Sequence, residues 1–116
     1  MKQIIFPASE KQIRSLTTGD YITINGIIIT ARDMAHKYIS DNLLAGFSSY
    51  NKEDEAVYQR LKEVLKDSAI YHCGPVVKTE ADGSYTFLSA GPTTSIREEP
   101  YEAAIMEHFQ VRAIIG

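Results

Sequence analysis

Residues 91–97 bring three hydroxyl side chains and a cation together within one short segment. Thr93, Thr94 and Ser95 follow a Gly-Pro turn. Arg97 lies within one helical turn of them. Hydroxyls and free amides in such a turn can form a nest for an anion, and an arginine can add a two-pronged, charge-assisted hydrogen bond to a carboxylate. The segment therefore predicts a site for a small anion, with a hydroxyl-rich helix cap beside a solvated arginine as the structural alternative.

A second segment of the same kind occurs at residues 30–33, which read Thr-Ala-Arg-Asp between an expected strand and an expected helix. Thr30 is expected to cap that helix, with Asp33 in capping-box position. Arg32 would then oppose the helix dipole at a cost of roughly 0.3–1 kcal/mol, so that either Asp33 or a bound anion should compensate. His36 shares the face of Arg32. A surface pair of Arg32 and Asp33 is the alternative, but two such junctions suggest a binding face for a compact di-acid or phosphate.

The remaining candidates for chemistry are weaker. His72 and Cys73 are adjacent, so on a strand they face opposite ways and do not form a nucleophile–base pair. Cys73 is the only cysteine and is expected to be a small buried residue. The three histidines have no metal-ligand spacing among them. The sequence therefore predicts no metal site on this chain.

Composition narrows the class of protein. A length of 116 residues fits a single domain, here taken as residues 1–116. The net charge of -3 and the scattered lysines and arginines argue against a nucleic-acid binder. With one cysteine there is no internal disulfide, so a reducing, cytoplasmic setting is expected. No apolar run approaches the roughly 20 residues of a membrane span.

The expected strands include two hairpins. Asn25-Gly26 joins two β-branched runs at 21–24 and 27–30, and this dipeptide is typical of a tight type I′ turn. The second arm is apolar at three successive positions, so both of its faces should be covered. The other hairpin joins 76–79 to 85–88. Further strands are expected at 2–6, 69–73 and 111–115.

The expected helices number about three besides a weak turn at 9–16. The first follows Thr30 and extends to about Leu44, the second follows its cap Asn51 and extends to about Leu65, and the third runs from about Pro100 to Gln110. Residues 46–52 should form a loop. Because Pro100 disfavours helical geometry at Glu99, one irregular turn should precede the last helix. The pattern predicts an α/β fold of the mixed α+β kind.

Three motifs carry a family resemblance. They are residues 29–36 (Ile-Thr-Ala-Arg-Asp-Met-Ala-His), 71–77 (Tyr-His-Cys-Gly-Pro-Val-Val) and 89–97 (Ser-Ala-Gly-Pro-Thr-Thr-Ser-Ile-Arg). In this order they resemble the β subunit, or C-terminal domain, of the class I fumarate hydratase and L-tartrate dehydratase family. The resemblance covers most of the chain. It implies a swivelling β/β/α domain with mixed sheets that closes over a partner.

The resemblance also implies a reaction and its residues. A partner α subunit or N-terminal domain would hold a [4Fe-4S] cluster, in a hetero- or homo-oligomer, and water would be added to or removed from a 2-hydroxy dicarboxylate, with fumarate and malate favoured over tartrate. Matching positions give Thr93 as the base and Thr94 beside it at the substrate. Arg32 and Arg97 would bind carboxylates. The supporting residues would be Asp33, His36 and Ser95.

Two departures from the family leave alternatives open. The segment from Gly46 to Lys66 is longer than expected, and family members continue into a Lys-Gly-Gly segment whose lysine meets the substrate, whereas this sequence ends at Gly116. A truncated piece, a short subunit and an inactive relative are all consistent with this. The alternative function is a non-catalytic carboxylate-binding or assembly module. An aconitase-like swivelling domain fits the architecture but not the motif at 91–97.

Overall fold

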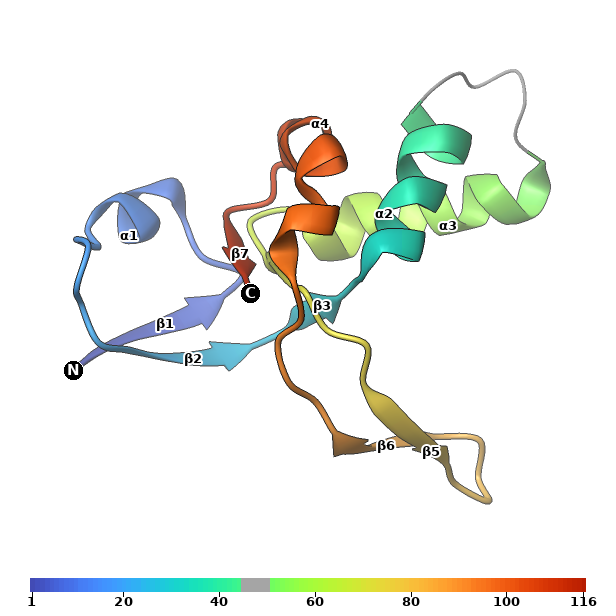
Figure 1. Cartoon of the computed structure of the whole chain (residues 1–116), viewed down its shortest axis with the longest axis horizontal. Coiled ribbons are helices and arrows are strands. Elements are labelled where there is room, and N and C mark those ends of the chain that lie inside the picture. Colours follow the sequence, from blue (N-terminus) through green and yellow to red (C-terminus); the bar gives the residue numbers. More distant parts are fainter. Residues whose placement is uncertain (45–50) are drawn as a thin grey trace.

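A three-stranded parallel sheet lies at the centre of the molecule. The computed structural model describes residues 1–44 and 51–116. In it, β3 (Ile28–Thr30), β4 (Ala69–Tyr71) and β7 (Ala113–Ile115) pair in the order β3-β4-β7 (Figure 1). Because all three strands are parallel, their carboxyl ends meet at one edge of the sheet.

The sheet separates two hydrophobic cores, and strand alternation decides which residue enters which core. Side chains of successive strand residues point to opposite faces. One register row packs into the larger core and contains Ile29, Ile70 and Ile114. The preceding row packs into the smaller core and contains Ile28, Ala69 and Ala113. The expectation that the 27–30 arm is covered on both faces is thus confirmed for Ile28 and Ile29, whereas Ile27 is 62% exposed.

Helices cover the larger core. They are α2 (Asp33–Tyr38), which continues as a π-helical turn at Ile39–Leu44, α3 (Lys52–Leu65) and α4 (Glu99–Phe109). Their fully buried residues include Leu43, Leu65 and Ile105. The side chain of Asn51 caps α3 by accepting a 3.0 Å hydrogen bond from the Asp54 amide, as the sequence predicts. Val57 was expected on the buried face of this helix but is 40% exposed, and its neighbour Tyr58 is buried instead.

The smaller core lies under a separate two-stranded parallel sheet. β1 (Lys2–Phe6) pairs with β2 (Ile22–Gly26), and α1 (Glu10–Arg14) connects them. Ser9 and Gln12 form a capping box at the start of α1. Buried Ile4, Phe6 and Ala8 pack there together with Ala69 of the central sheet.

The hairpin predicted for residues 21–30 is wrong. β2 pairs with β1, and β3 pairs with β4, so the two runs belong to different sheets. Gly26 does take a positive φ, of +97°, but this conformation turns the chain from one sheet into the other. The Ile27 amide then donates a 3.1 Å hydrogen bond to the carbonyl of Phe6.

The hairpin predicted further along is confirmed. β5 (Val76–Thr79) and β6 (Tyr85–Ser89) are antiparallel, with a bulge between Val76 and Val77. This hairpin extends away from the rest of the molecule (Figure 1). The radius of gyration of 15.2 Å accordingly exceeds the roughly 13 Å of a compact domain of this length.

The predicted start of α2 is wrong, whereas the irregular turn predicted before α4 is present. Thr30 does not cap α2, because it ends β3 opposite Tyr71 and the helix begins at Asp33 with Arg32 at the cap position. By contrast, the irregular turn before the last helix is confirmed as a 3₁₀ turn at Ser95–Arg97, followed by α4 with a proline in its first turn. The predicted helix end at Gly46 and most of the 46–52 loop fall outside the described residues.

The mixed α+β fold class is confirmed, since helices and parallel and antiparallel sheets occur together. Within residues 1–44 and 51–116, none of the helices is both long and apolar enough to span a bilayer.

Candidate functional site

The first predicted junction lies at the carboxyl edge of the central sheet. Ala31 directly follows β3, and its amide donates a 2.9 Å hydrogen bond to the carbonyl of Tyr71. His72 directly follows β4, and its amide donates a 2.8 Å bond to the carbonyl of Ile115. These bonds extend the strand pairing by one residue, so Arg32 leaves the sheet beside His72. Ligands of parallel sheets commonly bind beyond this edge.

The second predicted junction is held at the same edge. The amide of Thr93 donates a 2.7 Å hydrogen bond to the carbonyl of His72. The Ser95 hydroxyl lies 2.8 Å from His72 Nδ1. The hydroxyl-rich turn is therefore joined to the end of β4 by one backbone bond and one side-chain bond. The structure thus brings the two junctions to one residue, His72, which sequence reasoning had set aside.

Arg32 lies over a shallow pocket of about 450 Å³. The lining residues come from 30–35 and 73–75. Gly74 packs directly under the arginine: a Cβ at this position would lie 2.5 Å from Arg32 Cδ and 3.0 Å from Nη1. The absence of a side chain at Gly74 therefore lets the Arg32 side chain lie across the turn that follows β4.

Neither arginine is neutralised by a neighbour in the described structure. Within residues 1–44 and 51–116, no carboxylate lies within ion-pair distance of Arg32 or Arg97, and both side chains are exposed. Asp33 does not reach Arg32, and its Oδ1 accepts a 3.1 Å hydrogen bond from the Met34 amide instead. Among the described residues, both guanidinium groups are therefore without an ionic partner.

The hydroxyls of the second junction differ in exposure. Thr93 and Ser95 are half-buried, whereas Thr94 is exposed. The half-buried pair is also the pair tied to His72, so Thr94 is the hydroxyl with the freest access to solvent. The exposed Ile96, at 67%, leaves the outer side of this turn uncovered.

His36 stabilises the first junction through the backbone of Arg32. Its ring Nδ1 lies 2.7 Å from the carbonyl oxygen of Arg32. Because a carbonyl can only accept, Nδ1 must carry the proton of this bond. The His36 ring is buried and meets the His72 ring edge to face, with centroids 5.2 Å apart. His36 thus links the backbone of Arg32 to His72.

Two acidic residues near the second junction, the buried Glu98 and the partly buried Glu102, carried no signal in the sequence. Glu98 is 1% exposed, and in the described part of the chain its Oε2 has no hydrogen-bond partner. Glu102 Oε1 lies 3.6 Å from His72 Nε2, outside hydrogen-bond distance. Acidic residues at the start of a helix ordinarily complement its dipole from the surface, so the burial of Glu98 could not be foreseen.

The described residues do not fit a metal or cluster site. Across residues 1–44 and 51–116, His, Cys, Asp and Glu form no group of three that could hold a metal ion. Cys73 is 2% exposed, as expected for a small buried residue. One buried thiol cannot supply the several thiolates that hold an iron–sulfur cluster.

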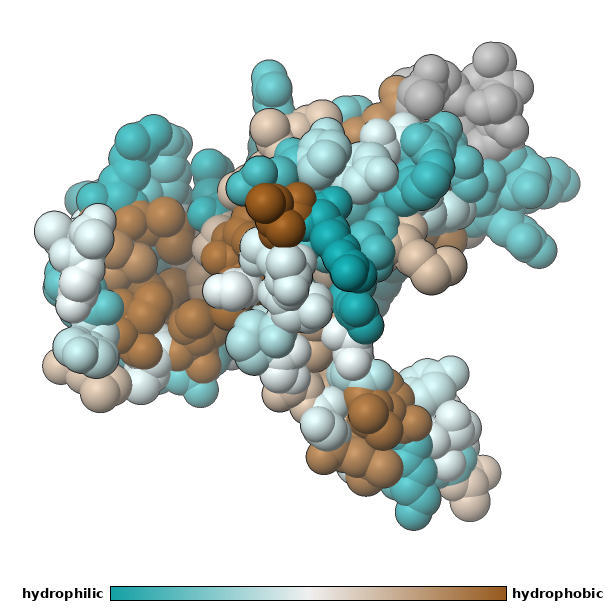
Figure 2. All heavy atoms as spheres, in the orientation of Figure 1, coloured by the Kyte–Doolittle hydropathy of each residue, from teal (hydrophilic) through white to brown (hydrophobic). Residues whose placement is uncertain are grey.

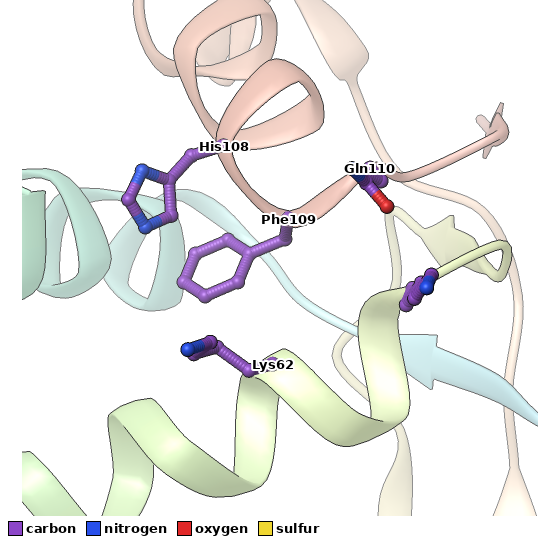
Figure 3. A pocket seen from close by; sticks show the side chains of 5 residues that line it. Lys62, His108, Phe109 and Gln110 are labelled. Carbon is purple, nitrogen blue, oxygen red and sulfur yellow. The ribbon is translucent and has the colours of Figure 1, made fainter.

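A second pocket, of about 250 Å³, lies between the ends of α3 and α4. Figure 3 shows His108 and Phe109 of α4 above Lys62 of α3. Lys62 and Lys66 lie at the carboxyl end of α3, where cations complement the helix dipole. His108 Nε2 lies 2.7 Å from the Tyr58 hydroxyl. These contacts account for the basic residues structurally, so this pocket is not the candidate site.

Comparisons with known proteins agree with the motifs. The family model described as Fumarase C-terminus matches residues 2–116. A Geobacillus stearothermophilus protein named fumarate hydratase class I is 44% identical over 110 residues. The L(+)-tartrate dehydratase subunit beta of Escherichia coli K12 is 27% identical over 117 residues.

The relatives are longer than this chain. The match covers 95% of this chain but 18% of the Geobacillus protein. It covers the whole chain and 50% of the Escherichia coli subunit. The chain thus spans half or less of these relatives. Because the family model extends over nearly every residue, the chain belongs to the fumarase C-terminus family.

Proposed function

We propose that this chain is the β subunit or C-terminal domain of an iron–sulfur-dependent hydro-lyase. The reaction would be the reversible addition or removal of water at a 2-hydroxy dicarboxylate. Membership of the fumarase C-terminus family supports this class of reaction, as do the names of the relatives. A reducing, cytoplasmic setting fits a chain with one free, buried cysteine.

The observation that carries the proposal is the pair of unpaired arginines on two turns tied to His72. Arg32 and Arg97 would each bind one carboxylate of the substrate. A hydrogen bond to a charged group contributes about 1.5–3 kcal/mol, so each arginine would contribute roughly ten- to a hundredfold in affinity. A substrate with two carboxylates would use both arginines, whereas a mono-acid would use only one.

Thr93 would act as the base that takes a proton from carbon, with Thr94 beside it at the substrate. A threonine hydroxyl is a poor base in water, so this role requires a desolvated setting with positive charge nearby. Half-burial of Thr93 and the unpaired arginines support that setting. The bond from its amide to His72 fixes the Thr93 backbone.

Asp33, His36 and Ser95 would hold the reacting residues in place without touching substrate. His36 would do so through the Arg32 carbonyl and Ser95 through His72, both at hydrogen-bond distance. Asp33 would act through the start of α2, because its carboxylate accepts from the Met34 amide.

The [4Fe-4S] cluster would belong to a partner subunit or domain, in a hetero- or homo-oligomer. When bound, such a cluster supplies a Lewis acid for the leaving hydroxyl. The single buried thiol of this chain supports a cluster held elsewhere. The greater length of the relatives leaves room for such a domain.

The β5–β6 hairpin provides a surface for that partner. Val77 pairs with Phe87 and Thr79 with Tyr85, so these four side chains share one face. Phe87 is 58% exposed and Tyr85 71%. Hydrophobic residues on the hairpin are visible in Figure 2. The other face is mixed: Thr86 donates a 2.8 Å hydrogen bond to Glu80, and Leu88, two residues further along the strand, is 62% exposed.

An isolated two-stranded hairpin with an uncovered apolar face is marginal in water. Its strands also start and end at the candidate site, because β5 follows Gly74-Pro75 and β6 leads into Gly91. A domain that covered this face would therefore border the substrate. This position fits a partner that brings a cluster to the site.

Fumarate and malate are favoured over tartrate. The higher identity to the protein named fumarate hydratase class I supports this preference. The test is to combine the full chain with its partner and compare kcat/KM for malate dehydration with that for L(+)-tartrate. A larger value for tartrate would overturn the preference. If the chain bound dicarboxylates but neither malate nor tartrate was turned over, the result would favour the alternative function, a carboxylate-binding module.

A further inference from the structure

His72 is linked to both arginine-bearing turns in the described structure. Its side chain is 0% exposed. On one side its ring packs edge to face on His36, whose Nδ1 is bonded to the Arg32 carbonyl. On the other side it meets the Ser95 hydroxyl through Nδ1 and the Thr93 amide through its carbonyl. Among the described residues, no other side-chain hydrogen bond or ion pair joins the Arg32 turn to the Thr93 turn.

Gly116, the residue that follows β7, packs closely against the contact between Ser95 and His72. A Cβ on Gly116 would lie 2.0 Å from Ser95 Oγ and 3.1 Å from His72 Nδ1. The end of β7 therefore presses against the Ser95–His72 pair from a third side. Interiors packed this closely transmit a displacement of one side chain to the next.

The polar atoms of His72 specify its orientation. Nδ1 faces the Ser95 hydroxyl, which can donate or accept. Nε2 faces the Glu102 carboxylate at 3.6 Å. In the tautomer with the proton on Nε2, this proton would face the carboxylate and Nδ1 would accept a hydrogen bond from the Ser95 hydroxyl. A ring turned by 180° would lose both contacts.

We propose that His72 is a positioning residue that couples the Arg32 turn to the Thr93–Arg97 turn, so that the two carboxylate-binding arginines keep a fixed separation. The coupling is a property of this chain alone. Its consequence for catalysis rests on the proposed function. A fixed separation would select a dicarboxylate by the distance between its two carboxylates.

Amide hydrogen exchange of the full chain tests the coupling without any substrate. His72→Phe keeps a ring but removes both polar atoms. The expected result is exchange about tenfold faster at the amides of Thr93 and His36, with the β1–β2 strands unchanged. Faster exchange in only one of the two turns, or an equal rise in β1–β2, would overturn the proposal.

Two further variants, His72→Asn and Ser95→Ala, complete the test. In His72→Asn an amide atom can take the place of Nδ1 and keep the bond to Ser95, so exchange should return most of the way to the wild-type rate. If His72→Phe does not fold, Ser95→Ala decides, because it should speed exchange at His36, to which Ser95 makes no hydrogen bond in the described structure. An unchanged rate at His36 in Ser95→Ala would contradict the coupling.

Enzyme assays separate this inference from the proposed function. In the assembled enzyme, His72→Phe should lower kcat/KM for malate about tenfold and His72→Asn should restore most of it. Coupled exchange without any dicarboxylate turnover would refute the function but leave the positioning role. Normal turnover with independent exchange of the two turns would refute the positioning role alone.

Discussion

The amide of Thr93 donates a 2.7 Å hydrogen bond to the carbonyl of His72. The β5–β6 hairpin separates these two residues in the sequence, and the bond holds the hydroxyl-rich turn beside the end of β4. It places Thr93 at the sheet edge from which Arg32 also emerges. The candidate site is therefore built by pairing at the edge of a parallel sheet, rather than by the loop of either motif alone.

Gly74→Ala should displace Arg32 while leaving the fold intact. The added Cβ would lie 2.5 Å from Arg32 Cδ, and the flexible arginine side chain can move away. KM for malate should rise about tenfold, with little change in kcat or in Tm. Gly91→Ala is the matched control, because a Cβ there meets nothing within 4 Å. An unchanged KM in Gly74→Ala would mean that the position of Arg32 does not matter for binding.

Gly26→Ala should destabilise the chain strongly. Gly26 has φ +97°, and a Cβ would lie 2.0 Å from the Phe6 carbonyl oxygen. Positive φ and a clash with backbone together should cost about 2–5 kcal/mol in the free energy of unfolding, measured by urea titration. Gly19→Ala, also at φ +97° but in open space, should cost only about 1–2 kcal/mol. Equal losses in both variants would contradict the close β1–β2 pairing at Gly26.

The hydroxyl of Tyr38 should lose its proton only at an unusually high pH. Its hydroxyl donates a hydrogen bond to Asp54 Oδ1, and this carboxylate raises the pKa of Tyr38 to about 12 from 10.0. Because the folded pKa lies above the unfolded one, the contribution of this pair to stability is complete below pH 10 and is lost as pH rises through about 12. Difference titration of tyrosinate absorbance between wild type and Tyr38→Phe measures it. Asp54→Asn should return the pKa towards 10, and a Tyr38 that titrates near 10 in the wild type would refute the pair.

Phe87→Ser should weaken association with the cluster-bearing partner. Phe87 is 58% exposed, so the fold itself should lose no more than about 0.5 kcal/mol. The Kd for the partner should rise at least about tenfold if this face is buried on binding. Thr86→Ala, on the opposite face of the same strand, is the control and should leave the Kd unchanged. Equal effects of the two variants would exclude the apolar face as the contact surface.

Local rules predicted the elements whose cause is local. The irregular turn expected before α4 is present as the 3₁₀ turn, but Glu99, where Pro100 was expected to disfavour helical geometry, is the first residue of α4, because a proline is tolerated in the first turn of a helix. The cap at Asn51 and the β5–β6 hairpin depend on neighbouring residues. Asn25-Gly26 misled because its positive φ serves equally well for a tight hairpin and for a crossing between sheets. The crossing between sheets forms because β2 pairs with β1, a strand that lies far away in the sequence.

The motifs predicted which segments form the site but not what joins them. Arg32 and the hydroxyl turn were each recognised from residue types and spacing. His72 was missed because its contacts with His36, Ser95 and Glu102 connect different elements. Nor could the sequence show that Asp33 would bond to the Met34 amide rather than to Arg32. Long-range packing decides both.

The most direct test of the dicarboxylate-clamp hypothesis is kcat/KM for malate dehydration by the chain combined with its partner, compared among single variants. Arg97→Ala should lower kcat/KM about ten- to a hundredfold through the lost carboxylate contact, and Thr93→Ala should lower it mainly through kcat. Arg14→Ala, which removes an exposed arginine paired with Glu10 on α1, should leave it unchanged. Wild-type kcat/KM in both Arg97→Ala and Thr93→Ala would contradict the proposed site.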